Sequence, residues 1–175
     1  AILFGSVGGP VKDSHLPKWK GCEVNSLLGL RKTFGFNANF RPVRVFPELV
    51  ANSPLKSSII GEGIDLLFIR ELNGDIYFGE KSRHFLEGRS VSRDVAEYSD
   101  EEISTVAKIA FQAARLRKKK VTSVDKANVL EVSRLWREVV NEVSQEFADV
   151  ELEHMLVDNC AMQIICNPAQ FDVIL

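Results

Sequence analysis

Apolar side chains recur along the chain in two patterns: short runs rich in β-branched residues and longer stretches with helical spacing. The clearest case is an apolar run that ends at Asp125, after which Leu135, Val139 and Val143 recur on one helical face. Strands that alternate with helices are typical of an α/β fold with a mainly parallel sheet flanked by helices. The predicted strands are 1–4, 36–46, 64–70, 76–79, 121–125, 150–157 and 171–175, and the predicted helices are 23–32, one starting at 99, one from 129 onward, and 160–166.

Local signals refine this outline. Pro42 cannot donate a hydrogen bond to a neighbouring strand, so its strand should lie at a sheet edge or contain a bulge. Ser99 and Glu102 have the spacing of a capping box, which marks the start of a helix. The polar segment 80–98 is predicted to be a protruding arm or a flexible loop. Because predicted strands stand at both ends, we expect the chain to begin and end within a fold.

Composition narrows the class of protein. Hydrophobic residues make up 45% and charged residues 26%, which is typical of a globular domain, and no apolar run is long enough to cross a bilayer. The net charge of -2 provides no basic excess for nucleic acid. Three cysteines without metal-like spacing fit a reducing compartment. We therefore expect a soluble, cytoplasmic protein without a nucleic-acid or membrane partner.

The corner between the central strand and the helix after it carries the first candidate for chemistry. Lys126 and Asn128 follow the strand directly, and ligands of open α/β sheets bind at the carboxyl ends of strands. A partly desolvated lysine there could exchange protons near neutral pH. The alternative is an ordinary solvent-exposed turn lysine. The helix that follows turns Arg134 and Arg137 toward its polar face.

Further charged residues stand near predicted strand ends. Arg31, Arg41 and Arg70 could together bind a small molecule with several carboxylates, because the guanidinium fork matches a carboxylate. Tyr77 and Asp158 add a proton donor and an acid. Each residue also has a simpler explanation: surface ion pairs for the arginines, a half-buried core ring for the tyrosine, a helix cap for the aspartate.

Six short segments carry a resemblance to a known family: Leu30–Lys32, Asn39–Pro42, Ser53–Lys56, Arg70–Gly79, Val124–Leu130 and Val157–Asn159. Taken together, these segments resemble the β-decarboxylating dehydrogenases, and within that family the 3-isopropylmalate dehydrogenases. By that resemblance, Leu27 and Leu28 favour isopropylmalate, because they offer an apolar surface where isocitrate enzymes present polar groups to a third carboxylate. Tartrate or homoisocitrate enzymes of the same family remain an alternative.

The resemblance implies NAD-dependent oxidative decarboxylation of 3-isopropylmalate to 2-oxoisocaproate in leucine biosynthesis. The implied substrate-binding residues are Arg31, Arg41, Arg70, Leu27, Leu28 and Asn128. Glu23 would contact the cofactor NAD beside the isopropyl group.

The catalytic residues that the resemblance implies are Lys126, Tyr77 and Asp158. Lys126 would remove the proton of the substrate hydroxyl, and Tyr77 would protonate the enolate carbon after decarboxylation. Asp158 would be a ligand of Mg²⁺ or Mn²⁺, which stabilises the enolate. The family usually has Thr and Gly in place of Asn73 and Asp75, and the carboxylate of Asp75 adds negative charge near the substrate.

The resemblance also implies a domain organisation. Residues 1–35 would be part of the cofactor domain, and residues 36–175 the substrate and dimerisation domain, with an arm at about 80–98. Lys126 and Asp158 would reach into the active site of a partner subunit, which makes the enzyme a homodimer. Because family members are much longer, a non-catalytic fragment or dimerisation module is a further alternative, and the metal site would be incomplete in this chain.

Overall fold

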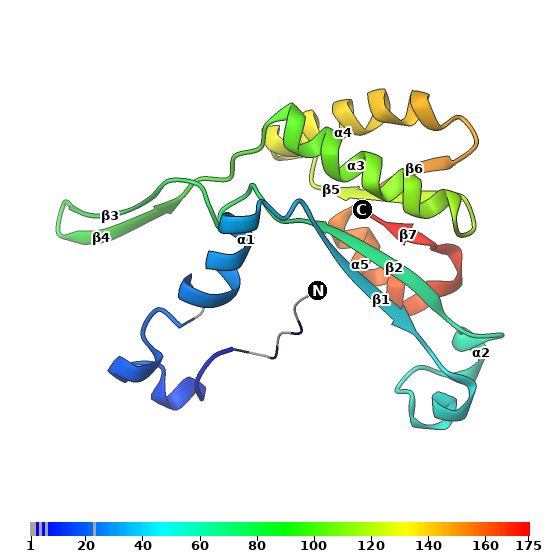
Figure 1. Cartoon of the computed structure of the whole chain (residues 1–175), viewed down its shortest axis with the longest axis horizontal. Helices are drawn as coiled ribbons and strands as arrows, with labels where there is room; N and C mark the ends of the chain where they lie inside the picture. Colours follow the sequence, from blue (N-terminus) through cyan, green and yellow to red (C-terminus); the bar gives the residue numbers. More distant parts are fainter. Residues whose placement is uncertain (1–2, 4, 6, 23) are drawn as a thin grey trace. The chain divides into compact units, whose positions relative to one another are not determined.

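The computed structural model describes residues 3, 5, 7–22 and 24–175 (Figure 1), and these divide into two compact units, Ala1–Phe36 and Asn37–Leu175. The first unit contains two short 3₁₀ turns and a helix. The helix begins as a π-helical segment, η3 (Val24–Leu28), and continues as α1 (Gly29–Phe34), in agreement with the helix predicted over 23–32. Gly35 ends it in a left-handed conformation. Glu23 and most of the predicted first strand lie outside the described residues.

The second unit is built on a five-stranded sheet with the strand order β1-β2-β7-β5-β6. β1 pairs antiparallel with β2, and the other pairs are parallel, as the alternation of strands and helices predicts. Pro42 lies in β1 at the edge of the sheet, where its missing N–H leaves no partner unsatisfied. The strands are β1 (Ala38–Arg44), β2 (Asp65–Glu71), β5 (Lys120–Asp125), β6 (Glu151–Leu156) and β7 (Val173–Ile174).

Helices cover both faces of this sheet, as Figure 1 shows for α3 and α4 on one side and α5 on the other. One core cluster joins α3 and α4 to the sheet through Val106, Val140 and Val121, and a second joins α5 through Cys160 and Phe171. The helices of this unit are α2 (Ser57–Ile60), α3 (Asp100–Arg115), α4 (Glu131–Ser144) and α5 (Val157–Cys166), with short 3₁₀ turns η4 (Pro47–Asn52), η5 (Gln145–Phe147) and η6 (Pro168–Gln170).

The start of α3 confirms the predicted capping box. The Ser99 hydroxyl accepts a hydrogen bond from the backbone N–H of Glu102 at 3.2 Å, and Glu102 Oε2 accepts from the Ser99 N–H at 2.8 Å. The predicted inward face of this helix, which includes Ile103, Val106 and Ala110, is completely buried.

The polar segment after the sheet's second strand forms a separate hairpin of β3 (Lys81–Leu86) and β4 (Arg89–Asp94). Glu87 and Gly88 connect the strands with φ angles of 49° and 78°, the conformation of a tight hairpin turn. Nearly all side chains on both faces of the hairpin are exposed. The hairpin agrees with the arm that was predicted, and its regular pairing contradicts the flexible-loop alternative.

Three sequence-based expectations are wrong. Residues 76–79 form a turn, not a strand. β6 ends at Leu156, so Asp158 lies in the first turn of α5 and not at the end of a strand. The last strand is only Val173–Ile174. Among the described helices, none has the length and apolar character needed to cross a bilayer.

Candidate functional site

The closest pairing of predicted site residues joins Lys126 to Asp158. Lys126 follows β5, and Asp158 follows the neighbouring parallel strand β6, whose Leu156 is paired with Asp125. The carboxyl ends of parallel strands meet at one rim, so the two side chains reach each other there. Lys126 Nζ lies 2.5 Å from Asp158 Oδ1. Asn128 lies two residues further on, exposed in the turn before α4.

The ion pair perturbs the carboxyl group of Asp158. The hydrogen bond from Lys126, supported by a backbone hydrogen bond, lowers the pKa of Asp158 below its usual range. The two side chains are 33% and 63% exposed, so the pair is accessible to a ligand. The structure therefore places the predicted base and the predicted metal ligand together.

A second group forms on the antiparallel strands β1 and β2. Arg70 is the cross-strand partner of Asn39, and Arg41 Nε donates a hydrogen bond to Asn39 Oδ1 at 2.6 Å. Residues two apart on a strand share a face, so the two arginines point to the same side of the sheet. Asn39 was not among the predicted site residues, although its spacing of two from Arg41 is the signal that could have found it.

Both groups lie on the face of the sheet that α5 covers. Phe68 and Val124 pack into the core cluster beneath α5, and alternation places Arg70 and Lys126 on that same face. β7 separates β2 from β5, which puts the two groups roughly 10 Å apart, or two strand spacings. A small dicarboxylate is too short to bridge the two groups fully.

Tyr77 lies in the turn that links β2 to the hairpin, and its ring is half exposed. The guanidinium of Arg70 stands over the ring, with 5.1 Å between Arg70 Cζ and the ring centroid. Lys81 Nζ donates hydrogen bonds to the carbonyl oxygens of Ile76 and Tyr77, the second at 3.0 Å. The predicted proton donor is thereby held next to a predicted substrate-binding arginine.

The same turn is fixed by backbone geometry. Asp75 has a φ of 68°, a left-handed conformation that favours glycine, and its carbonyl accepts from the N–H groups of Phe78 and Gly79. A Cβ on Gly74 would lie 2.4 Å from the ring of Tyr98, so only glycine fits there. Burial, with the nearby Asp75 carboxylate, raises the pKa of Tyr98 and keeps it neutral.

The remaining predicted site residues belong to the other unit. Leu27 ends the π-helical segment together with Leu28, and Arg31 lies in the following α1; all three side chains are partly buried. Their convergence with Arg41 and Arg70 stays a prediction. The predicted cofactor contact, Glu23, lies outside the described residues.

The carboxyl rim of the sheet offers one carboxylate to a metal ion. Among the residues that the structure describes, no three His, Cys, Asp or Glu side chains cluster closely enough to hold a metal. Asp158 alone fits the requirement of Mg²⁺ for a protein carboxylate, since Mg²⁺ commonly uses one or two carboxylates with water and substrate oxygens. The donor type therefore fits the predicted metal, and the other ligands must come from elsewhere.

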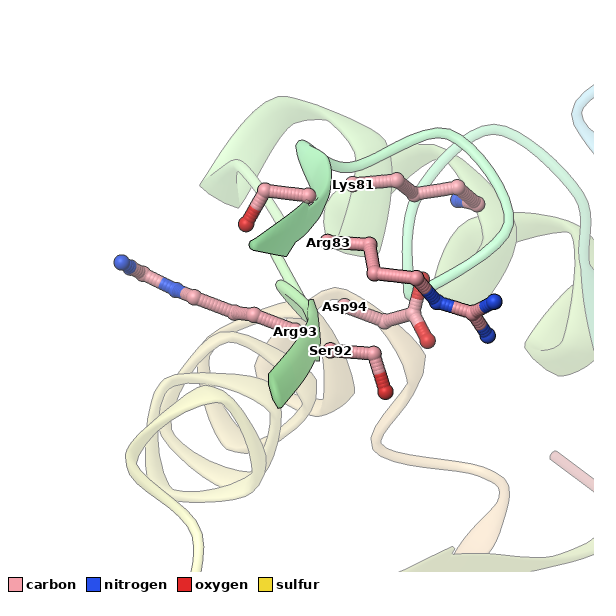
Figure 2. Close-up of a pocket in the computed structure, with 6 residues that line it drawn as sticks. Lys81, Arg83, Ser92, Arg93 and Asp94 are labelled. Atoms are coloured by element: carbon pink, nitrogen blue, oxygen red, sulfur yellow. The ribbon is translucent and has the colours of Figure 1, made fainter. Parts of the chain in front are cut away.

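One further concavity lies on the hairpin, with a volume of about 330 Å³. Figure 2 shows Lys81, Arg83, Ser92 and Asp94 on one side of the hairpin and Arg93 pointing to the other. The side chains line an open, polar surface and do not enclose a ligand. None of the predicted catalytic residues lines it, so we place the candidate site at the rim of the main sheet.

Comparisons with known proteins place the chain in a family. The family model described as isocitrate/isopropylmalate dehydrogenase matches residues 1–175. The chain is 53% identical over 174 residues to the 3-isopropylmalate dehydrogenase of Clostridium acetobutylicum, covering 99% of this chain and 48% of the relative. The enzyme of the same name from Pseudoalteromonas translucida is also 53% identical, over 176 residues, with 49% of it covered. The chain thus spans about half the length of the curated relatives it matches.

Solved structures show the same relationship. The TT0538 protein from Thermus thermophilus superposes with a TM-score of 0.74 at 34% identity, over 85% of this chain and 29% of that one. The isocitrate dehydrogenase from Methylococcus capsulatus superposes with a TM-score of 0.73 at 26% identity, over 98% of this chain and 46% of the other. The chain therefore belongs to the isocitrate/isopropylmalate dehydrogenase family.

Proposed function

We propose that the protein containing this chain is an NAD-dependent 3-isopropylmalate dehydrogenase of leucine biosynthesis, acting in the cytoplasm and producing 2-oxoisocaproate. The observation that carries the proposal is the 53% identity over 99% of the chain with a relative of that name. The isocitrate dehydrogenase of known structure is 26% identical, which favours isopropylmalate over isocitrate. Leu27 and Leu28 support the same choice, because an isopropyl group needs an apolar surface.

The substrate carboxylates would be bound by the arginines. Arg41 and Arg70 share a face and are held about one strand apart through Asn39, so they can bind neighbouring oxygens of one small dicarboxylate. Arg31 remains a predicted ligand of a substrate carboxylate. Holding the substrate by its carboxylates orients the hydroxyl-bearing carbon for reaction.

Lys126 and Tyr77 would carry the proton transfers. NAD accepts the hydride and a divalent metal stabilises the developing negative charge when both are bound. Lys126 takes the hydroxyl proton as the neutral amine, so its ammonium group, which binds Asp158 in the structure, must first give up one proton to solvent. Tyr77 donates its phenolic proton to the carbon left by carbon dioxide, and Arg70 over its ring steadies the phenolate.

The active unit would be a homodimer in which Lys126 and Asp158 serve the substrate bound by the partner. The roughly 10 Å between the arginine group and the lysine group within one chain is compatible with this arrangement. Val139, Val140 and Val143 of α4 are buried in the core that α4 shares with α3, so they are not free to bind a second copy. Apolar side chains that remain exposed and could bind a second copy are Val157, Met162 and Ile165 of α5 and Phe85 and Leu86 of the hairpin.

The direct test is a comparison of substrates with the complete enzyme, NAD and Mg²⁺. NADH formation is measured with 3-isopropylmalate, isocitrate and tartrate under identical conditions. We expect kcat/KM for 3-isopropylmalate to be at least about 100-fold higher than for isocitrate or tartrate. A site that binds an apolar group discriminates strongly against a polar group in the same place. A higher kcat/KM with isocitrate or tartrate would assign the enzyme to another branch of the family.

A dimerisation module without catalysis is the second candidate, favoured by the half-length match to the relatives and by the separate core of Asn37–Leu175. A calorimetric titration of a polypeptide limited to residues 1–175 with NAD tests whether these residues alone hold the cofactor. We expect no binding at micromolar NAD, because relatives with the activity use a chain about twice as long. Micromolar affinity would show that the cofactor site lies within these residues.

A further inference from the structure

Two buried aspartates lie at opposite rims of the parallel sheet, and each is paired with an arginine. Asp125 ends β5 at the carboxyl rim, and its side chain is 1% exposed. Asp172 directly precedes β7 at the amino rim, and its side chain is 2% exposed. A buried carboxylate destabilises the fold unless its charge is paired and its oxygens accept hydrogen bonds. Each aspartate–arginine pair therefore fixes the position of the groups that bind it.

Asp125 is saturated with hydrogen bonds. Arg137 of α4 binds it with both arms of the guanidinium, Nε to Oδ2 at 2.9 Å and Nη2 to Oδ1 at 2.8 Å. Oδ1 also accepts the backbone N–H of Ala127 at 2.9 Å. The helical period predicts that Arg137 lies on the solvent face of α4. In the structure the Arg137 side chain instead turns back to the sheet, where it binds Asp125.

The other polar backbone groups of the corner are bound as well. The backbone N–H of Lys126 donates to Ser133 Oγ at 3.1 Å, and Arg134 Nε donates to the carbonyl of Ala127 at 3.2 Å. The Lys126 carbonyl accepts from the N–H groups of Val129 and Leu130. The first two turns of α4 therefore send three side chains back to the residues around Lys126.

This bonding fixes the point from which the Lys126 side chain extends. The peptide groups on both sides of its Cα are held by Ser133 and Asp125, so only the side-chain torsions stay free. A base must stand within hydrogen-bond reach of the proton it removes, and small displacements of a positioned group cost large factors in rate. The buried Asp125–Arg137 pair stands directly next to the candidate base.

We propose that Asp125, together with Arg137 and Ser133, is a positioning device that aims the Lys126 side chain at the substrate. This inference rests on the proposed dehydrogenase function. In this role Asp125 and Ser133 act through the backbone N–H groups of Ala127 and Lys126, to which they are hydrogen-bonded.

The two rims provide a matched comparison in the complete enzyme. Asp125→Ala and Asp172→Ala each remove a buried carboxylate that pairs an arginine and accepts a backbone N–H. We expect Asp125→Ala to lower kcat with 3-isopropylmalate by about 10- to 100-fold, with a KM change of less than about threefold. Asp172→Ala should leave kcat within about twofold of wild type, although it unfolds at a comparably lower urea concentration.

Ser133 supplies a milder pair of variants in case Asp125→Ala fails to fold. Ser133→Ala removes the acceptor for the Lys126 N–H and should lower kcat about 10-fold, whereas Ser133→Thr keeps the hydroxyl and should restore it. Amide hydrogen exchange at Lys126 should be faster in Ser133→Ala than in Ser133→Thr.

The outcomes separate the inference from the function on which it rests. If the wild-type enzyme does not oxidise 3-isopropylmalate, the proposed function fails. If the wild type is active but Asp125→Ala and Ser133→Ala keep its kcat, or if Asp172→Ala loses as much kcat as Asp125→Ala, the positioning role is overturned. A rise in KM with unchanged kcat would also overturn it, since that would indicate substrate binding.

Discussion

Replacing Asp172 with alanine should strongly destabilise the second unit. Asp172 Oδ1 accepts from Arg117 Nε at 2.7 Å, and Oδ2 accepts from the backbone N–H of Lys118 at 2.7 Å. These bonds tie the segment after α3 to the start of β7. The variant leaves the Lys118 N–H without its partner and leaves Arg117 with Asp65 alone.

The size of the loss follows from the burial of the pair. Breaking a buried ion pair costs about 3–5 kcal/mol, and we take the lower end because the Arg117 side chain is 23% exposed and keeps its bond to Asp65. The expected loss in the free energy of unfolding is therefore about 3 kcal/mol. With a urea m-value of about 2 kcal/mol/M for a domain of this size, the midpoint should fall by about 1.5 M.

Asp65→Ala is the matched control, because Asp65 binds the same arginine at 2.7 Å but is 47% exposed. An exposed pair contributes at most about 1 kcal/mol, so its midpoint should fall by no more than about 0.5 M. Urea unfolding of residues 1–175, followed by circular dichroism, measures both variants. Equal midpoints for the two variants, or a loss below about 1 kcal/mol for Asp172→Ala, would refute the reasoning from burial.

Three smaller changes test other parts of the account. Asp75→Gly should raise the free energy of unfolding by about 1 kcal/mol, because glycine adopts a φ of 68° without strain; a lower melting temperature would contradict this. Ser99→Ala removes the cap of α3 and should cost about 1 kcal/mol in urea unfolding, and an unchanged midpoint would show that the cap is dispensable. Burial and the nearby Arg137 lower the pKa of His154 below its ordinary 6.5, so the unfolded chain takes up a proton first and stability decreases as the pH falls through 6.5 toward the lowered pKa of the folded state. His154→Gln should reduce this pH dependence, and an equally steep decrease would mean that other groups cause it.

The parts of the fold that could be predicted are those fixed by local spacing. The capping box at Ser99 needs only residues three apart, and its hydrogen bonds form as expected. The meeting of Lys126 and Asp158 follows from the rule that parallel strands end at one rim. Pro42 predicts that its strand lies at a sheet edge or contains a bulge, because proline cannot donate to a neighbouring strand, and β1 lies at the edge.

The parts that could not be predicted depend on contacts distant in sequence. The β-forming residues at 76–79 favour a strand, but the structure has a turn there, and Gly79 packs so closely against Val95 that a Cβ would lie 1.9 Å from the Val95 carbonyl oxygen. Helical periodicity predicts that Arg137 faces solvent. It carries no information about the buried aspartate at the end of the preceding strand, which binds the Arg137 side chain. Helical spacing likewise cannot show that Val139, Val140 and Val143 of α4 are buried in the core shared with α3.

The decisive measurement compares Lys126→Ala with Lys108→Ala in the complete enzyme. Lys108 is an exposed lysine on α3 that pairs with Glu146 at 3.1 Å, as Lys126 pairs with Asp158, but it lies away from the rim. If Lys126 is the base that takes the hydroxyl proton, its replacement should lower kcat for NADH formation from 3-isopropylmalate by roughly two to four orders of magnitude. Lys108→Ala should keep the wild-type rate. A Lys126→Ala enzyme within about threefold of wild type would contradict the assignment of the candidate site.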